Sequence, residues 1–110
     1  MDKPQSLLAL GALAHETRVE VFRLLMRTEP HGLFAGEIAE RLGVRQNTLS
    51  SNLAILERAG LVRGTREGRS IRYRAELEGM RGLLAFLMED CCGSRPERCR
   101  ALLEELACAC

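Results

Sequence analysis

Apolar positions recur every three to four residues along most of the chain, and their spacing changes to every second residue only once. The three-to-four spacing predicts helices over 5–13, from about Glu16 to Met26, over 36–42, from about Gln46 to Gly60, over about 76–90 and over 97–107. The alternating spacing predicts strands over 61–66 and 70–75, joined by a turn at Glu67-Gly68. The expected fold is therefore mainly α with a small β-hairpin, in the order α-α-α-α-β-β-α plus a short C-terminal helix.

Turn residues mark where these helices stop. Glu29-Pro30-His31-Gly32 is a turn sequence, Gly43 is placed to cap the helix over 36–42, and Gly93 and Pro96 end the long helix before the tail. A short helix, a tight turn and a second helix is the helix-turn-helix arrangement.

The helix that begins near Gln46 has two different sides. Leu49, Leu53 and Leu56 are spaced i, i+4 and i+7, so we expect them in the core. The opposite side carries short polar groups and an arginine: Gln46, Asn47, Thr48, Ser50, Ser51, Ala54 and Arg58. Short polar side chains suit contact with base edges in a major groove, although they also occur on ordinary solvent-facing helices.

Charge is distributed in blocks that the net value of +1 conceals. Residues 1–40 sum to −2, residues 41–74 to +6 and residues 75–110 to −3, and every basic residue of the central block is arginine. Arginine suits hydrogen bonding to phosphates and base edges. This block favours a polyanionic partner over a merely solvated basic face.

The predicted hairpin supplies much of that charge through Arg63, Arg66, Arg69, Arg72 and Arg74. The helix from about Gln46 to Gly60 would read DNA bases (the reading helix), and the hairpin over 61–75 would be a basic wing. This combination fits a winged helix-turn-helix, in which the wing contacts phosphate or enters a minor groove. The candidate contacts to double-stranded DNA are Gln46, Asn47, Thr48, Ser50, Ser51, Arg58, Arg66, Arg69 and Arg72.

The size and composition of the chain exclude several other classes. A chain of 110 residues with 46% hydrophobic residues indicates one globular domain, and no apolar run approaches 18 residues. We therefore expect no membrane partner, and a start of Met1-Asp2-Lys3-Pro4 that does not resemble a secretion signal favours the cytoplasm. No catalytic constellation is present, so we expect no enzyme.

The segment "EIAERLGVRQNTLSSNLAILERAGLVRGTREGRSIRYR", preceded by "LAHETRVEVFRLL", resembles the ArsR/SmtB family of metalloregulatory repressors over about residues 9 to 90. The resemblance implies a homodimer, formed by the first and last helices, that represses an operon until an inducer binds. The apolar side of the predicted last helix agrees with such a dimer: Leu77, Met80, Leu83, Leu84, Leu87 and Met88.

The chain departs from the family in its sensor residues. Arg45 stands where many members open the reading helix with serine or threonine. The cysteine pair of the arsenite repressors is missing from Gly32–Glu37, and the last helix lacks the histidines of the zinc sensors. Those two sensor sites are excluded.

Five cysteines remain, all after residue 90. Clustered thiolates select soft ions, and three sulfurs suit trivalent arsenic or antimony. A subgroup of arsenite repressors with its site at the end of the last helix is similar here, which implies ligands at Cys91, Cys92 and Cys99, with Cys108 and Cys110 as less favoured ligands. Residues 1–90 would bind DNA and dimerise, and residues 91–110 would bind As(III) or Sb(III), with no permanent cofactor.

Two other interpretations of the thiols stay open. The chain could sense another soft metal, or it could sense oxidation through disulfide formation. A different class, a small thiol redox or metal-storage protein, would make the basic wing incidental.

Overall fold

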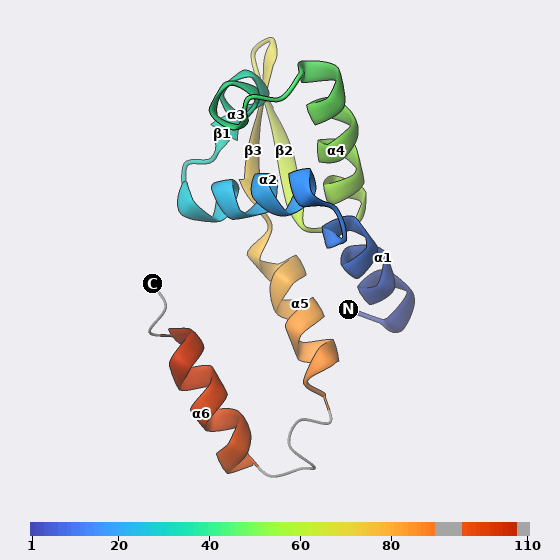
Figure 1. The fold of residues 1–110 in the computed structure, drawn as a ribbon, viewed down its shortest axis with the longest axis vertical. Coiled ribbons are helices and arrows are strands. Elements are labelled where there is room, and N and C mark those ends of the chain that lie inside the picture. Colours follow the sequence, from blue (N-terminus) through green and yellow to red (C-terminus); the bar gives the residue numbers. More distant parts are fainter. Residues whose placement is uncertain (90–95, 108–110) are drawn as a thin grey trace.

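The computed structural model describes residues 1–89 and 96–107, and its elements run in the predicted order with one addition (Figure 1). The elements are α1 (Lys3–Leu13), α2 (Glu16–Arg27), β1 (Leu33–Phe34), α3 (Ala35–Leu42), α4 (Gln46–Arg58), β2 (Val62–Glu67), β3 (Ser70–Ala75), α5 (Leu77–Leu87) and α6 (Pro96–Ala107). The prediction of a mainly helical fold with a small hairpin is confirmed, and so is Gly43 as the left-handed cap of α3.

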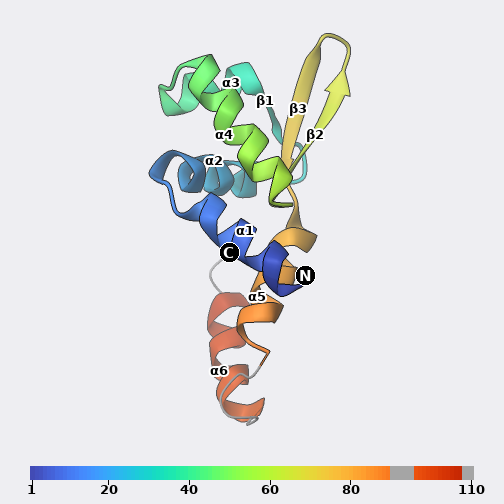
Figure 2. The same cartoon turned by 90° about the vertical axis from the view of Figure 1, so that its right-hand side faces the viewer.

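The sheet has three antiparallel strands in the order β1-β3-β2, so the predicted hairpin gains a third strand. β1 consists of two residues that pair Leu33 with Tyr73 and Phe34 with Arg72. The predicted turn is wrong by one position, because Glu67 still pairs with Ser70 and the turn is therefore Gly68-Arg69. Figure 2 shows the hairpin extending past the rest of the sheet.

The core lies where α4 packs against α1, α2, α3 and β2. Leu49, Leu53 and Leu56 are buried in it, as their spacing predicted. Leu25 and Ile38 join them from the two preceding helices. This packing fixes which side of α4 faces outward.

Three of the four leucines of α1, Leu7, Leu8 and Leu10, are exposed, and only Leu13 packs against the core. The side of α1 that packs on the domain consists of Ser6, Ala9 and Ala12, whereas Leu7 is 56% exposed and Leu8 44% exposed. Small residues let α1 approach its neighbours closely and leave Leu7, Leu8 and Leu10 on the outside.

The C-terminal helices form the end of the molecule opposite the hairpin (Figures 1 and 2). α5 is shorter than the predicted helix over 76–90 and buries only Leu83 fully. Leu77, Leu84 and Leu87 are exposed, as are Leu102 and Leu106 on α6. A search of the described residues finds no helix that is long and apolar enough to cross a membrane.

Candidate nucleic-acid interface

The outward side of α4 carries every candidate residue predicted on that helix. Gln46, Asn47, Thr48, Ser50, Ser51 and Arg58 are all exposed, together with Ala54. Their position follows from the core, because burial of Leu49, Leu53 and Leu56 turns the other side of the helix to solvent. The structure thus brings the polar candidates onto one continuous surface.

The start of α4 lacks a side-chain cap from the residue before it. Arg45 occupies the cap position, and its side chain makes no capping hydrogen bond within the part of the chain that the structure describes. Asn47 instead accepts a hydrogen bond from the backbone N–H of Thr48 at 2.8 Å. Because helix N-termini carry partial positive charge, this end of α4 suits an anionic neighbour.

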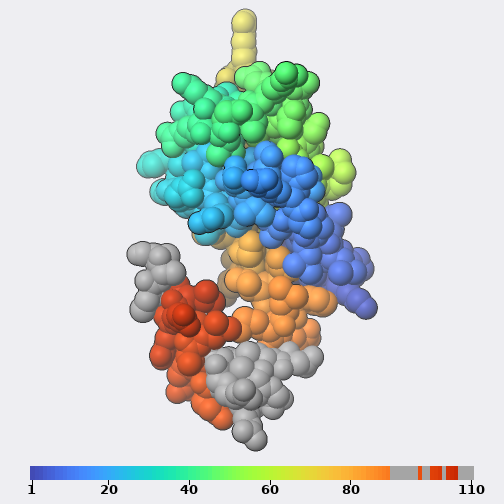
Figure 3. All heavy atoms as spheres, in the orientation of Figure 1, coloured from blue at the N-terminus to red at the C-terminus, as the bar shows by residue number. Residues whose placement is uncertain are grey.

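A hollow separates the first turns of α4 from the sheet. It is lined by Phe34, Ala35, Gly36, Gln46, Ser50, Arg69, Ser70, Ile71 and Tyr73. The residues come from β1, α3, α4 and the hairpin, so the reading helix and the wing share one concave surface. Figure 3 shows the hairpin tip protruding above the helices beside it.

The arginines of the wing fall into two groups. Arg63 pairs with Glu76 at 2.9 Å, and Arg72 and Arg74 both approach the same oxygen of Glu67, at 2.8 and 3.9 Å. Arg66 and Arg69 are exposed and pair with no acidic group among residues 1–89 and 96–107. Only these two of the five wing arginines therefore present an uncommitted charge.

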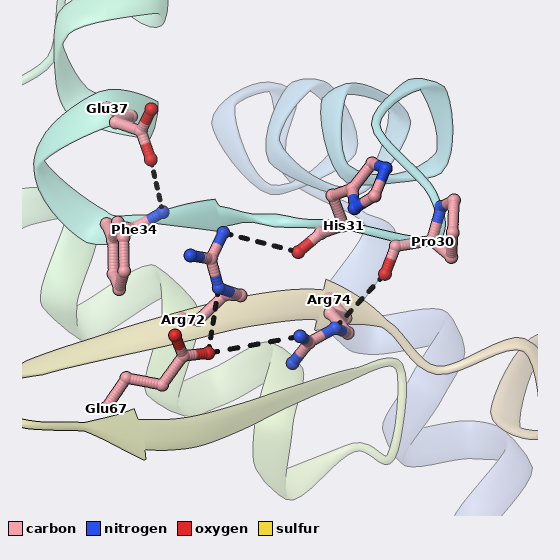
Figure 4. Close-up of polar contacts among 7 residues, drawn as sticks. All are labelled: Pro30, His31, Phe34, Glu37, Glu67, Arg72 and Arg74. Atoms are coloured by element: carbon pink, nitrogen blue, oxygen red, sulfur yellow. Dashed lines mark hydrogen bonds and ion pairs between the residues drawn. The ribbon is translucent and has the colours of Figure 1, made fainter.

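Arg72 contrasts with the other DNA candidates because protein groups surround it. Its guanidinium donates to Glu67 and to the carbonyl oxygen of His31, and it lies 4.1 Å from the centre of the Phe34 ring (Figure 4). Its predicted contact with DNA would require some of these interactions to break.

Tyr73 lines the hollow from β3, and burial raises the pKa of its hydroxyl above the usual value of 10.0. The negative charge of Glu57 raises the pKa further. Tyr73 is therefore a neutral hydroxyl at physiological pH, available as a hydrogen-bond donor beside the reading helix.

Comparison with known proteins assigns this arrangement to a family. A family model described as a helix-turn-helix domain matches residues 13–65. The transcriptional activator HlyU of Vibrio cholerae is 30% identical over 83 residues, which cover 76% of this chain and 74% of HlyU. An ArsR-like transcriptional regulator from Rhodococcus sp. RHA1 is 28% identical, covers 97% of this chain and 96% of its own, and superposes with a TM-score of 0.68. The chain belongs to the ArsR-like helix-turn-helix transcriptional regulators.

A third match bears on the wing. A Mycobacterium bovis fragment, described as a homodimeric winged helix-turn-helix DNA-binding domain, superposes on this ArsR-like regulator with a TM-score of 0.65. It is 28% identical and covers 79% of this chain and 81% of its own. The predicted winged helix-turn-helix fold is confirmed, and the prediction of a regulator that is not an enzyme agrees with these relatives.

The predicted thiolate site of this ArsR-like regulator is not tested. Cys91, Cys92, Cys108 and Cys110 lie outside the described residues, and Cys99 is described only as a backbone position in α6. Among the described residues, no group of three His, Cys, Asp or Glu side chains is placed to hold a metal ion. The division into residues 1–90 and 91–110 likewise stays a prediction.

Sequence reasoning missed two links between α1, α2 and α4. Arg18 donates to the carbonyl oxygen of Ala12 at the end of α1 and to Oδ1 of Asn52 on α4, the latter at 3.2 Å. Gln5 donates through Nε2 to the carbonyl oxygen of Ala59 at 2.8 Å. Asn52 carried a weak signal, because it lies next to Leu53 on the inward side of α4 and a polar residue there needs a partner.

Proposed function

We propose that this regulator is a repressor that binds double-stranded operator DNA and is released by trivalent arsenic or antimony. The observation that carries the DNA-binding part is the exposed polar side of α4, with the uncommitted Arg66 and Arg69 beside it. Gln46, Asn47, Thr48, Ser50 and Ser51 would contact bases and nearby phosphates, and Arg58, Arg66 and Arg69 would contact phosphates.

A dimer is the second part of the proposal. Leu7, Leu8 and Leu10 of α1 and Leu84 and Leu87 of α5 are exposed on helices that contact each other. A second copy would cover these side chains and would place two reading helices on one duplex. The operator would then be palindromic, with half-sites about 10 bp apart or a multiple of that spacing.

The inducer is proposed from the sequence of the tail. Thiolates at Cys91, Cys92 and Cys99, with Cys108 and Cys110 as substitutes, supply the soft ligands that trivalent arsenic and antimony prefer. Binding near the end of α5 would change how the two copies are placed relative to each other. A coupling of about 1–3 kcal/mol is typical and would weaken DNA binding about five- to 150-fold.

The decisive experiment measures DNA binding with and without effectors. The probe is a duplex that the protein itself selects from a random-sequence library, and the effectors are arsenite, antimonite, cadmium, zinc and peroxide. We expect release by arsenite or antimonite alone. Release by cadmium or zinc would indicate another soft metal, and release by peroxide alone would favour a thiol redox sensor.

Serine substitutions separate the inducer site from DNA binding. Cys91→Ser and Cys92→Ser each remove one thiolate at nearly constant size, so each variant should bind the selected duplex and remain bound when arsenite is added. Cys99→Ser should do the same if it supplies the third ligand. The Cys108→Ser/Cys110→Ser variant is the matched control and should respond as the parent does. Release of all five single variants by arsenite would contradict the metalloid proposal.

The five thiols in the last 20 residues also favour a second candidate, oxidation sensing by the same winged fold. Failure to select any duplex from the library would instead favour a small thiol redox or metal-storage protein.

A further inference from the structure

A cluster of charged and aromatic groups ties the wing to the turn that precedes α3. Arg72 donates through Nε to Oε2 of Glu67 at 2.8 Å and through Nη1 to the carbonyl oxygen of His31 at 3.4 Å. Arg74 donates to the carbonyl oxygen of Pro30 at 3.2 Å. Two arginines of β3 therefore hold two consecutive carbonyls of one turn, and Glu67 of β2 lies between the two guanidinium groups (Figure 4).

The aromatic ring of Phe34 completes this cluster. The central carbon of the Arg72 guanidinium lies 4.1 Å from the ring centre, which is the distance of a cation–π contact. The Arg72 side chain is only 24% exposed as a result. The backbone N–H of Phe34 donates to Glu37 at 2.9 Å. Phe34 is therefore tied to the first turn of α3, where the helix-turn-helix begins.

The strand register places Arg72 away from the hollow. Glu67, Arg72 and Arg74 alternate with Arg66, Ile71 and Tyr73, so the two sets lie on opposite faces of the hairpin. Ile71 and Tyr73 line the hollow shared with α4. Arg72 thus lies on the face of the hairpin opposite Ile71 and Tyr73, and it contacts Phe34, which also lines the hollow.

The position of Arg72 along β3 is also distinctive. β1 pairs with β3 only at Leu33–Tyr73 and Phe34–Arg72, so Arg72 is the outermost residue of β3 with a strand on both sides. Beyond it the wing is a two-stranded ribbon, and such a ribbon is only marginally stable by itself. Contacts at Arg72 therefore determine how firmly the tip with Arg69 is held.

The turn that receives these arginines is itself closely packed on β3. Gly32 has a φ of 72°, and a Cβ added there would lie 2.3 Å from the carbonyl oxygen of Tyr73. Only glycine allows this approach of the two backbones. The turn and β3 are thus held together by a close backbone contact as well as by surface side chains.

We infer that Arg72 is a positioning residue, which orients the wing through Glu67, Phe34 and the His31 carbonyl instead of contacting a phosphate. This inference rests on the proposed DNA-binding function. It gives the wing arginines two different roles: Arg69 binds phosphate from the tip, and Arg72 sets where that tip stands relative to α4.

The two roles differ in how they tolerate lysine. A phosphate contact needs mainly a positive charge, so Arg69→Lys should lose much less affinity than Arg69→Ala does. Arg72 needs a planar fork that donates in two directions and stacks on a ring, which lysine cannot supply. Arg72→Lys should therefore weaken binding nearly as much as Arg72→Ala, by about tenfold if it loses interactions of about 1–2 kcal/mol.

The salt dependence of binding separates the roles further. The experiment uses the full chain, the duplex it selects from a random library, and a series of salt concentrations. Arg69→Ala removes two phosphate contacts per dimer, so the slope of log K against log[salt] should flatten by about 2. Arg72→Ala and Arg72→Lys should weaken binding without changing that slope.

Phe34→Leu gives a second, charge-neutral variant. It removes the ring under Arg72 and keeps every charge, so it should also weaken binding at constant slope. Amide hydrogen exchange checks that each variant is folded: exchange should rise at residues 66–72 while α2 and α4 remain protected. This pattern supports a loosened wing on an intact domain.

Other outcomes would overturn the inference. If Arg72→Lys binds as the parent does and Arg72→Ala flattens the slope as Arg69→Ala does, Arg72 is a phosphate contact. If none of the Arg72 and Phe34 variants changes affinity or exchange, the cluster has no role in positioning the wing. The proposed DNA-binding function fails separately, if the parent protein selects no duplex or if Arg69→Ala leaves both affinity and slope unchanged.

Discussion

Arg18 shows how one side chain can join three helices. It lies on α2, donates to carbonyl oxygens at the end of α1 and donates to Asn52, which is only 5% exposed on α4. The pairing satisfies a buried amide oxygen and the carbonyl of Ala12, and it adds a second donor to the carbonyl of Gly11, which already accepts from the N–H of Ala14. The reading helix is therefore linked by hydrogen bonds to the helix that carries the exposed leucines.

Arg18→Ala should lower the free energy of unfolding by about 1–3 kcal/mol, because it leaves the buried Asn52 oxygen without its donor. Urea denaturation monitored by circular dichroism measures the change. Arg23→Ala is the matched control, since Arg23 is exposed on the same helix, and it should shift the stability by less than about 0.5 kcal/mol. Equal effects of the two substitutions would show that the hydrogen bonds of Arg18 do not contribute to the free energy of unfolding.

Tyr73 offers a direct titration, because it is the only tyrosine and the chain has no tryptophan. Burial and the nearby Glu57 raise its pKa in the folded state above 10.0, so its ultraviolet titration should have a midpoint above that of the urea-unfolded chain. The folded state then holds the proton more tightly, so this contribution to stability is complete below pH 10 and is lost as the pH rises through the folded-state pKa. Tyr73→Phe should remove that loss; a midpoint equal to that of the unfolded chain would refute the prediction.

At the scale of elements, periodicity predicted the helices that bury large side chains and failed where burial follows another rule. α4 begins at Gln46, near where it was predicted to begin, because Leu49, Leu53 and Leu56 repeat on one side and are buried. α1 repeats leucines too, yet it buries Ser6 and Ala9, because only small side chains allow the close approach of α1 to the domain there. Two residues of β1 are too few to show any alternation, so pairing with β3 was not predictable.

The candidate site, like the fold, was predictable only in part. The exposed side of α4 follows from its apolar side, and the hairpin follows from alternation. What the sequence could not show is which wing arginines already have partners. Arg72 meets the carbonyl of His31, 41 positions earlier in the chain, and such a contact depends on how the turn crosses the sheet.

The junction between α4, β2 and α5 depends on a close contact between two glycines. A Cβ added at Gly79 would lie 1.8 Å from the carbonyl oxygen of Gly60, so α5 begins directly against the turn that ends α4. Gly79→Ala should force these elements apart. The free-energy cost should exceed the gain in helix propensity of about 1 kcal/mol, so the melting temperature should fall markedly.

Gly11→Ala provides the control for that substitution. Gly11 is also a helical glycine, in α1, and an added Cβ there would meet nothing within 4 Å. It should stabilise the protein by up to about 1 kcal/mol, so thermal unfolding of the two variants should move in opposite directions. If Gly79→Ala also raised the melting temperature, the close contact at Gly60 would not be a feature of the folded protein.

At the scale of the whole molecule, polar and apolar surfaces occupy opposite ends. The exposed side of α4 and the wing tip lie at one end of a body that measures 49 × 30 × 24 Å, and α5 and α6 lie at the other (Figure 1). Between them, α1 carries Leu7, Leu8 and Leu10 outward and packs its small residues on the domain. Two copies joined through the apolar surface could therefore present both reading helices without covering either.

Leu84→Glu tests this arrangement, because Leu84 is 43% exposed on α5 and its replacement should disturb association and not the fold. A charge placed in a desolvated interface is costly, so sedimentation at micromolar concentration should show a monomer in place of the parent dimer. Met26→Glu is the control, since Met26 is 39% exposed on α2 and not on α1 or α5, the helices that carry the exposed leucines of the proposed interface, and this variant should remain dimeric.

DNA binding should follow association in the same two variants. The monomer contacts one half-site and loses the high effective concentration of the second reading helix, so Leu84→Glu should bind the selected duplex at least about 100-fold more weakly while circular dichroism stays unchanged. Met26→Glu should bind as the parent does. A monomeric Leu84→Glu protein that bound the duplex with parental affinity would mean that one reading helix and one wing suffice. A Leu84→Glu protein that remained dimeric would place the interface away from α5.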